Sequence, residues 1–318
     1  MSTYKSLQGN LVQYLSSDPS PVVEGQVWYN STSNTLKAYA VGAESWATGG
    51  NLNTARDLLF GSGTTLANTI VFGGDNGPSR VTSSEKYDGS SWTNTPSLNT
   101  ARSAGGSVSD GTSSATLGFG GYPSTNTNEE WDGSSWTSTS TYGNSGYGMM
   151  GAGTQTAGLG CGGTGGTTTT FEYDGSSWTS GGAYPGGLYL GAVTGTQTAA
   201  LGHAASGGAG NTTVKAYDGS TWSSSPAYPG GAPRTGAFGG TSGAVFGQNG
   251  PPDVSVTVNV YDGTSFSGGP NMSVAKGGLT GRGGTAASGL FCGTTSPRSG
   301  ATEEWTGAVL GTQTISSS

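Results

Sequence analysis

The segment Tyr87-Asp88-Gly89-Ser90-Ser91-Trp92 decides the fold, because close copies of it return at a nearly fixed interval along the chain. The later copies begin at Trp131, Tyr173, Tyr217, Tyr261 and, in a degenerate form, Trp305. Successive copies therefore start 44, 42, 44, 44 and 44 residues apart. A period of about 40 to 50 residues is typical of solenoids and β-propellers.

Each repeat carries the signals of short strands and none of a helix. Asp-Gly between apolar stretches favours a two-residue hairpin turn with positive φ at both central residues. The aromatic before the turn and the Trp after it are therefore expected on paired antiparallel strands. Upstream, Ile70-Val71-Phe72-Gly73-Gly74 predicts a strand that ends at a glycine pair, and another strand is predicted after Asn53-Thr54-Ala55-Arg56. Four strands per repeat make one propeller blade.

The order of these strands resembles the kelch repeat, and the resemblance covers residues 51–310. It implies an all-β fold, a kelch-like β-propeller whose four-stranded blades pack face to face through the repeated aromatics. Six blades are expected, and seven is the alternative because the N-terminal segment offers additional strands. The six innermost strands are predicted to begin near Arg56, Arg102, Tyr147, Tyr189, Arg234 and Lys276.

The repeat divides the chain into three parts. Residues 1–23 lie outside it, include Asp18-Pro19-Ser20-Pro21, and are expected to form an extended N-terminal arm. Residues 24–50 are predicted to form a β-hairpin with a four-residue polar loop, followed by a closing strand. The propeller is expected over residues 51–318.

Trp46 indicates how the ring closes. It precedes the first Asn-Thr-Ala-Arg segment by the same spacing as Trp92 precedes the second. An outer strand around Trp46 is therefore predicted to complete the last blade, whose own Trp position is occupied by Leu310. Deleting residues 1–48 should then destabilise the whole ring.

The composition excludes several classes of protein. Gly contributes 62 of 318 residues, yet only 9% of residues are charged, and 8 Trp, 14 Tyr and 8 Phe require burial, unlike a disordered chain. A net charge of −7 argues against nucleic acid and anionic membrane as partners. No membrane span and no secretory signal are recognised, so synthesis in a cytoplasm is expected.

Three arginines are the candidate contact residues. Arg56, Arg102 and Arg234 share one position in their repeats and would line a mouth of the channel, where they would bind an anionic sugar. The alternative is structural pairing with glutamates placed two residues before the leading aromatics. Pairing is favoured because only three of six repeats carry Arg there. The glutamates are Glu85, Glu129 and Glu303.

The remaining polar positions predict neither catalysis nor a cofactor. Cys161 and Cys292 fall in repeats on opposite sides of a ring, so free buried thiols are expected. His203 is the single histidine and takes the same packed position, which leaves no cluster for zinc or copper. The repeated aspartates are expected to stabilise their own turns, with a calcium-binding ring as the weaker alternative. They are Asp88, Asp132, Asp174, Asp218 and Asp262.

Several further stretches carry a signal of lineage. They are the opening Met1–Ser6, Glu24–Asn30 with Leu36-Lys37, the Gly-Thr-Gln-Thr-Ala copies at Gly153–Ala157 and Gly195–Ala199, and Glu303-Glu304-Trp305. With them the chain is similar to virion proteins of marine tailed bacteriophages that carry kelch-like repeats. The resemblance covers essentially the whole chain.

This resemblance implies a virion structural protein, an appendage or fibre-tip propeller. Its arm would anchor it to other virion proteins, and its loops would attach to a host-surface glycan. The position on the particle (tail, fibre or capsid) and the oligomeric state stay open. The alternative is a stand-alone, lectin-like propeller that binds carbohydrate; no enzymatic activity is expected from either.

Overall fold

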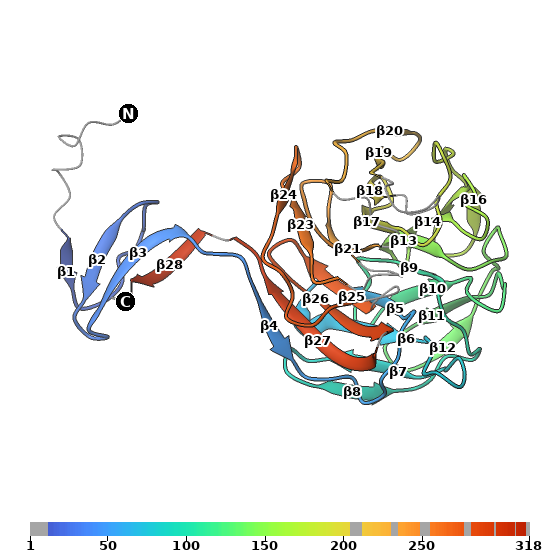
Figure 1. Cartoon of the computed structure of the whole chain (residues 1–318), viewed down its shortest axis with the longest axis horizontal. Helices are drawn as coiled ribbons and strands as arrows, with labels where there is room; N and C mark the ends of the chain where they lie inside the picture. The colour runs from blue at the N-terminus through green and yellow to red at the C-terminus, as the bar shows by residue number, and fades with distance from the viewer. Residues whose placement is uncertain are drawn as a thin grey trace. The chain divides into compact units, whose positions relative to one another are not determined.

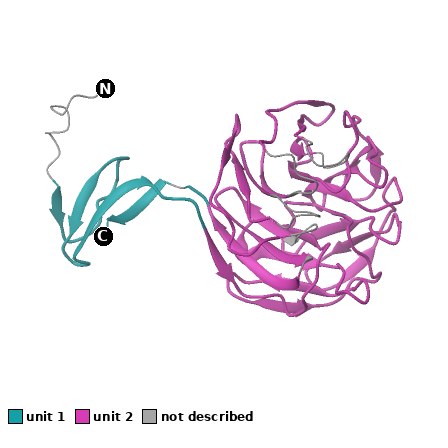
Figure 2. Ribbon diagram, viewed as in Figure 1, with its two compact units in different colours: residues 1–45, 307–318 teal, residues 46–306 magenta. Residues whose placement is uncertain are grey.

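A computed structural model describes residues 12–203, 212–229, 235–248, 255–276, 281–295, 297–308 and 310–315. The chain divides into two compact units, residues 1–45 with 307–318 (unit 1) and residues 46–306 (unit 2) (Figure 2). Among the described residues the secondary structure is all β, apart from the short 3-10 helix η2 (Leu66–Asn68). Seven four-stranded sheets are present, and the prediction of an all-β fold is confirmed.

Six of the seven sheets belong to unit 2, and their strands are antiparallel neighbours. The first two sheets are β5 (Phe60–Gly63), β6 (Thr69–Phe72), β7 (Ser84–Tyr87) and β8 (Trp92–Thr95), and β9 (Gly106–Ser107), β10 (Thr116–Phe119), β11 (Asn128–Trp131) and β12 (Trp136–Ser138). The third and fourth are β13 (Met149–Thr154), β14 (Ala157–Gly162), β15 (Thr170–Tyr173) and β16 (Trp178–Ser180), and β17 (Ala192–Thr196), β18 (Ala199–His203), β19 (Val214–Tyr217) and β20 (Trp222–Ser224). The fifth and sixth are β21 (Thr235–Gly240), β22 (Gly243–Gln248), β23 (Val258–Tyr261) and β24 (Phe266–Gly268), and β25 (Gly281–Thr285), β26 (Ser288–Thr295), β27 (Arg298–Thr306) and β4 (Ser45–Gly49).

The first strand of each sheet lies in the middle of unit 2 (Figure 1). These inner strands contact one another in cyclic order: β5 with β9, β9 with β13, β13 with β17, β17 with β21, β21 with β25, and β25 with β5. They begin a few residues after the predicted positions. Four-stranded sheets placed in this way are consistent with a β-propeller.

The repeated aromatics pair across the turn that joins the two outer strands. Tyr87 lies directly opposite Trp92, with ring centroids 4.8 Å apart, and the other copies repeat this contact at 4.9 to 5.4 Å. The loop between them has four residues rather than the predicted two, and only Gly89 has positive φ, at 95°.

Each repeated aspartate stabilises its own turn, as the favoured interpretation predicts. Asp88 Oδ1 accepts hydrogen bonds from the backbone N–H groups of Ser90 and Ser91, both at 2.8 Å. These hydrogen bonds lower the pKa of Asp88 to about 2. Because the equivalent aspartates lie in different sheets with the same local partners, they do not form a shared ring.

Polar side chains join neighbouring sheets. The Tyr217 hydroxyl donates to Glu172 Oε1 at 2.5 Å, and Tyr87 donates in the same way to Glu304, which links the first sheet to the last. The glutamine of the repeated Gly-Thr-Gln-Thr-Ala segment has a similar role. Gln155 Nε2 donates to the carbonyls of Thr116 and Trp131, in the preceding sheet, at 3.1 and 2.9 Å.

Trp46 occupies the predicted place in the last sheet. β4 lies beside β27, and the Trp46 ring lies 5.1 Å from Trp305, the distance seen in the other aromatic pairs. Trp46 Nε1 donates to the Pro270 carbonyl at 3.0 Å. Leu310, at the Trp position of the degenerate last repeat, does not belong to this sheet. It begins β28 (Leu310–Ile315), which belongs to unit 1 because it pairs with β3.

Unit 1 contains one sheet, in the order β1 (Gln13–Leu15), β2 (Val27–Asn30), β3 (Thr35–Val41) and β28. The predicted β-hairpin is present as β2 and β3, while β1 runs parallel to β2. Both chain ends therefore contribute to this sheet.

The prediction of an extended arm over residues 1–23 needs correction from residue 12 onward; residues 1–11 lie outside the described ranges. β1 belongs to the sheet, and Asp18 fixes the segment that follows it. The Asp18 carboxylate accepts from Trp28 Nε1 at 3.0 Å, Asn30 Nδ2 at 2.7 Å and Lys37 Nζ at 2.8 Å. These groups lower the pKa of Asp18 to about 2, the Lys37 hydrogen bond most strongly.

Candidate functional site

Two of the three predicted contact arginines, Arg56 and Arg102, do not lie at a surface. Arg56 and Arg102 both have 0% exposure, and their guanidinium groups pair with Glu85 at 2.9 Å and Glu129 at 3.3 Å. The structural pairing that the sequence favoured is therefore present at these two positions, and the mouth-lining role is wrong for both. Arg234 lies outside the described residues.

The asparagine of the Asn-Thr-Ala-Arg segment completes this arrangement. The Asn99 N–H donates to Glu129 Oε2 at 2.7 Å, while its side chain donates to the Trp136 carbonyl at 3.0 Å. Arg102 donates to the Gly120 and Gly118 carbonyls at 2.8 and 3.1 Å. The segment thus holds three strands of its own sheet in place, and its repetition reflects structure.

The cysteines and the histidine belong to the interior. Cys161 and Cys292 are free thiols with 0% exposure, and burial raises the pKa of Cys292 to about 12. His203 is equally buried and its ring lies 4.7 Å from Tyr228. All three are core positions, as predicted.

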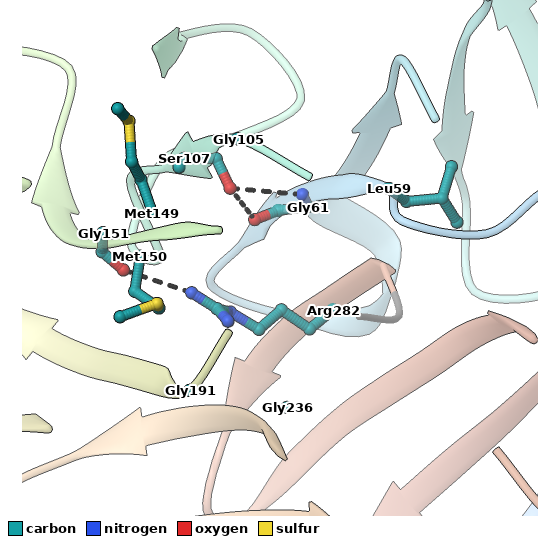
Figure 3. A pocket seen from close by; sticks show the side chains of 11 residues that line it. Leu59, Gly61, Gly105, Ser107, Met149, Met150, Gly151, Gly191, Gly236 and Arg282 are labelled. Atoms are coloured by element: carbon teal, nitrogen blue, oxygen red, sulfur yellow. Dashed lines mark hydrogen bonds between the residues drawn. The ribbon is translucent and has the colours of Figure 1, made fainter. Parts of the chain in front are cut away.

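The axis of unit 2 is closely packed. Gly61, Gly151 and other inner-strand glycines bring the strands close together around a cavity of about 20 Å³ (Figure 3). A Cβ added at Gly151 would lie 2.5 Å from the Ser107 carbonyl oxygen. Arg282 crosses this space and donates to the carbonyls of Gly151 and Val193, both at 3.1 Å. It therefore links β25 to β13 and β17.

Asp110 is the acidic group whose negative charge raises the pKa of Arg282, and it lies where inner strands end in their hairpin turns. It lines a depression of about 540 Å³ whose other lining residues are Gly, Ala, Ser and Thr. Burial raises the pKa of Asp110 to about 6, although Ser109 and Arg282 oppose the change. Burial likewise lowers the pKa of Arg282 to about 10.

We expect Asp110→Asn to change how stability depends on pH. Because the folded-state pKa of about 6 exceeds the ordinary 3.8, Asp110 contributes stability below pH 3.8 that is lost as pH rises through 6. The free energy of unfolding of the wild type should therefore fall by about 1 kcal/mol between pH 5 and pH 7.5, relative to the variant. Denaturant titrations at both pH values measure this difference.

Asp262→Asn is the matched control. Hydrogen bonds in its turn lower the pKa of Asp262 to about 2, so its contribution is lost only as pH falls from 3.8 through 2. The difference between wild type and this control should stay constant from pH 5 to pH 7.5. Equal pH profiles for wild type and Asp110→Asn would contradict the assignment.

The opposite end of the inner strands has a strained backbone. Leu58, Ala104 and Leu190 have φ values of 51°, 55° and 57°, a region that residues other than glycine adopt at a cost of about 1–2 kcal/mol each. Gly148 has the equivalent conformation, with φ of 72°. Such conformations persist where surrounding contacts hold them, and they concentrate at binding sites.

A series of backbone hydrogen bonds explains these conformations. The Ala104 N–H donates to the Leu58 carbonyl at 2.9 Å, and the Gly148 N–H donates to the Ala104 carbonyl at 2.5 Å. The Leu190 N–H continues the series to the Gly148 carbonyl at 3.0 Å. The entrances of four consecutive inner strands are thereby joined into a rigid rim.

Three tyrosines from three sheets lie on this rim. Tyr122 follows the glycine pair after β10, and Tyr147 and Tyr189 directly precede Gly148 and Leu190. The ring centroids of Tyr122 and Tyr147 are 5.2 Å apart, and those of Tyr147 and Tyr189 are 5.9 Å apart. The rings meet edge to face and surround a depression of about 220 Å³.

Charged groups complete the depression, which we call the tyrosine pocket. Its residues are Leu58, Asp75, Arg80, Ser103, Ala104, Tyr122, Tyr147, Tyr189 and Leu190. The Arg80 guanidinium lies over the Tyr122 ring, 3.9 Å from its centroid. Asp75 is held from outside the pocket by Arg298, which also binds Asp57 at 3.2 Å. Burial raises the pKa of Asp57, and Arg298 opposes that change.

Sequence reasoning missed this pocket, although one signal was present. In the sequence repeat, Tyr147 and Tyr189 align with Arg56 and Arg102. In the structure the equivalent positions are marked by the residues with positive φ, and this alignment moves by one residue. Those residues are Leu58, Ala104, Gly148 and Leu190. The tyrosines thus correspond to Asp57 and Ser103. Tyrosine at two of these positions was a visible departure from the repeat.

No protein-family model matches this chain, and neither does any curated protein. In the part of the chain that the structure describes, no helix is long and apolar enough to span a membrane. The same residues contain no cluster of three His, Cys, Asp or Glu side chains suited to a metal ion.

Proposed function

We propose that the six sheets of unit 2 form a six-bladed, kelch-like β-propeller, and that the chain is a structural protein of a phage particle. In this proposal the whole of unit 1 attaches the chain to other virion proteins, whereas the sequence predicted that the N-terminal arm alone would do so. The rim of unit 2 binds a host-surface glycan. The cyclic contacts of the inner strands support the propeller assignment. The resemblance of the sequence to virion proteins of tailed bacteriophages supports the assignment to a phage particle.

The distribution of exposed apolar side chains carries the proposal. Among the described residues, seven large hydrophobic side chains are exposed, and all but Tyr122 lie in unit 1. The others are Val12, Tyr14, Val23, Val41, Leu310 and Ile315, with exposures from 44% to 74%. Unit 1 is a single small sheet, and this many exposed apolar side chains on a small unit favour a protein–protein interface.

The exposed apolar side chains thus suggest a different role for each unit. The surface of unit 1 favours contact with protein, whereas Tyr122, the one exposed aromatic among the described residues of unit 2, lies in the tyrosine pocket. Binding rather than catalysis is proposed for that pocket, because its side chains offer aromatic faces and one cation. A rigid scaffold that presents polar loops suits recognition of a surface.

The first test is mass spectrometry of purified particles of the phage that carries the gene. We expect the chain to be present, and the triple variant Val12→Ser, Val23→Ser, Val41→Ser to reduce its copy number about tenfold or more. All three side chains are more than half exposed, so folding should be unaffected. Loss of apolar contact area is the expected cause.

The matched control replaces three exposed threonines on outer strands of unit 2, Thr93→Ser, Thr137→Ser and Thr179→Ser. We expect this variant to enter particles at the normal copy number. A chain that is missing from particles, or a triple valine variant that enters them normally, would refute the attachment role. The first of these results would favour the stand-alone lectin-like alternative, which the tyrosine pocket also supports.

A further inference from the structure

Arg80 is a cation whose hydrogen-bond donors are unused. Within the described ranges its guanidinium makes no hydrogen bond or ion pair, and its Nε atom is buried without a partner. The other described arginines, Arg56, Arg102, Arg282 and Arg298, all donate to carbonyls or carboxylates. Guanidinium is planar and matches a carboxylate with two parallel hydrogen bonds, so Arg80 is equipped for an anionic group.

The position of Arg80 is fixed in advance. Its loop is held by the Gly77 N–H, which donates to Asp75 Oδ1 at 2.8 Å, and by the Ser79 N–H, which donates to Asn76 Oδ1 at 3.2 Å. The Tyr122 ring supports the guanidinium from one side. A fixed donor loses little conformational freedom when it binds.

The tyrosines define the rest of the ligand. Tyr122 is 39% exposed, and Tyr147 and Tyr189 are partly exposed beside it. Exposed aromatic faces and edges at a shallow depression offer contact to a flat ring that has C–H groups on its faces and hydroxyls on its rim. A pyranose has this shape, and an acidic pyranose adds one carboxylate for Arg80.

We propose that the tyrosine pocket binds an acidic sugar residue, with the sugar ring against Tyr122 and Tyr147 and its carboxylate on Arg80. This inference rests on the proposed function, since it names the class of glycan that the rim of unit 2 recognises. The net charge of −7 gives an anionic ligand no long-range attraction. Recognition therefore depends on the local donors of Arg80.

The neighbouring charges do not compete for this role. Asp57 and Asp75 face Arg298, which lies within 3.4 Å of an oxygen of each. Two carboxylates and one guanidinium leave one formal negative charge over, and both carboxylates are held by Arg298 rather than by Arg80. Arg80 remains the one charged side chain of the pocket without a counter-charge among its described contacts.

The test is calorimetric titration of the full chain with tetramers of galacturonic, glucuronic and mannuronic acid. The methyl ester of each tetramer is the matched ligand, because it keeps the ring and removes the charge. At least one acid should bind about tenfold more tightly than its ester, the gain typical of one charge-assisted pair. Added salt should weaken binding of the acid and leave the ester unchanged.

Variants assign the binding to residues. Arg80→Gln should reduce affinity for the acid to that for the ester, while Tyr122→Leu should weaken both about fivefold to tenfold. Lys215→Gln is the control, because it removes one positive charge from a different surface, where Lys215 contacts Ser224. Circular dichroism confirms that each variant is folded.

Several results would overturn the inference. They are equal affinity for acid and ester, an Arg80→Gln variant that binds as the wild type does, or a wild type that binds none of the three acids below about 1 mM. Binding is measured on purified protein, so this result is independent of particle incorporation. A chain that binds acid but is absent from particles would refute the proposed function alone.

Discussion

Arg102→Met is expected to lower the free energy of unfolding of unit 2 by about 3–5 kcal/mol, the usual cost of breaking a buried ion pair. Arg102 has 0% exposure, and its pKa, although burial lowers it to about 10, keeps it charged at neutral pH. Methionine would leave the Glu129 carboxylate buried without its counter-charge. It would also remove the donors to the carbonyls of Gly118, Gly120 and Thr127.

Denaturant titration followed by tryptophan fluorescence measures this change, because seven of the eight tryptophans lie in unit 2. Lys215→Met is the matched control, since Lys215 is a lysine at the surface, and it should stay within about 0.5 kcal/mol of the wild type. Adding Glu129→Leu to Arg102→Met should recover part of the loss, because no unpaired charge then remains. A single variant as stable as the control would show that the pair is not needed.

Much of unit 2 was predictable because its determinants lie close together in the sequence. The turn between Tyr87 and Trp92 is made within six residues, and its aspartate forms the same hydrogen bonds in all five copies that carry it. Pairing of the repeat-position arginine with a glutamate about 30 residues later also follows from the period. Errors arose in details such as loop length, which depends on the strand register.

Identical local sequences with different structures show where such prediction fails. Gly-Thr-Gln-Thr forms the hairpin between β13 and β14 at residues 153–156, and the one between β17 and β18 at residues 195–198. At residues 311–314 the same four residues are extended within β28. Only pairing with β3, about 270 residues away in sequence, selects the strand. Propensity alone cannot distinguish these two outcomes.

The tyrosine pocket could not be predicted from the sequence for a related reason. Arg80 and Tyr122 lie in loops whose lengths differ between repeats, so the period does not align them with other copies. Their meeting depends on the rim conformation, in which Leu58 and Leu190 adopt positive φ that leucine disfavours. Contacts between sheets impose that conformation, and the local sequence contains no signal for it.

Truncation of the two chain ends is expected to give opposite results. Removing residues 1–48 takes away the partly buried Trp46 and most of β4, and should lower the stability of unit 2 by about 3–5 kcal/mol, because side-chain packing and strand pairing are lost together. The Trp46 ring stacks on Phe291 at 5.8 Å and packs against Trp305. Without β4, the hydrogen-bonding edge of β27 is also exposed, which promotes aggregation.

Removing residues 307–318 instead takes away β28, which pairs with β3 in unit 1. The unfolding midpoint of unit 2 should then be unchanged, while the sheet of unit 1 loses a strand. Trp46→Ala in the full chain separates loss of the ring contacts from loss of the strand, and should cost about 2–3 kcal/mol by itself, because the ring is only partly buried. If the C-terminal truncation destabilised unit 2 as much as the N-terminal one, β4 would not be the strand that completes the last sheet. Fluorescence from Trp28, in unit 1, reports on the other sheet in the same titration.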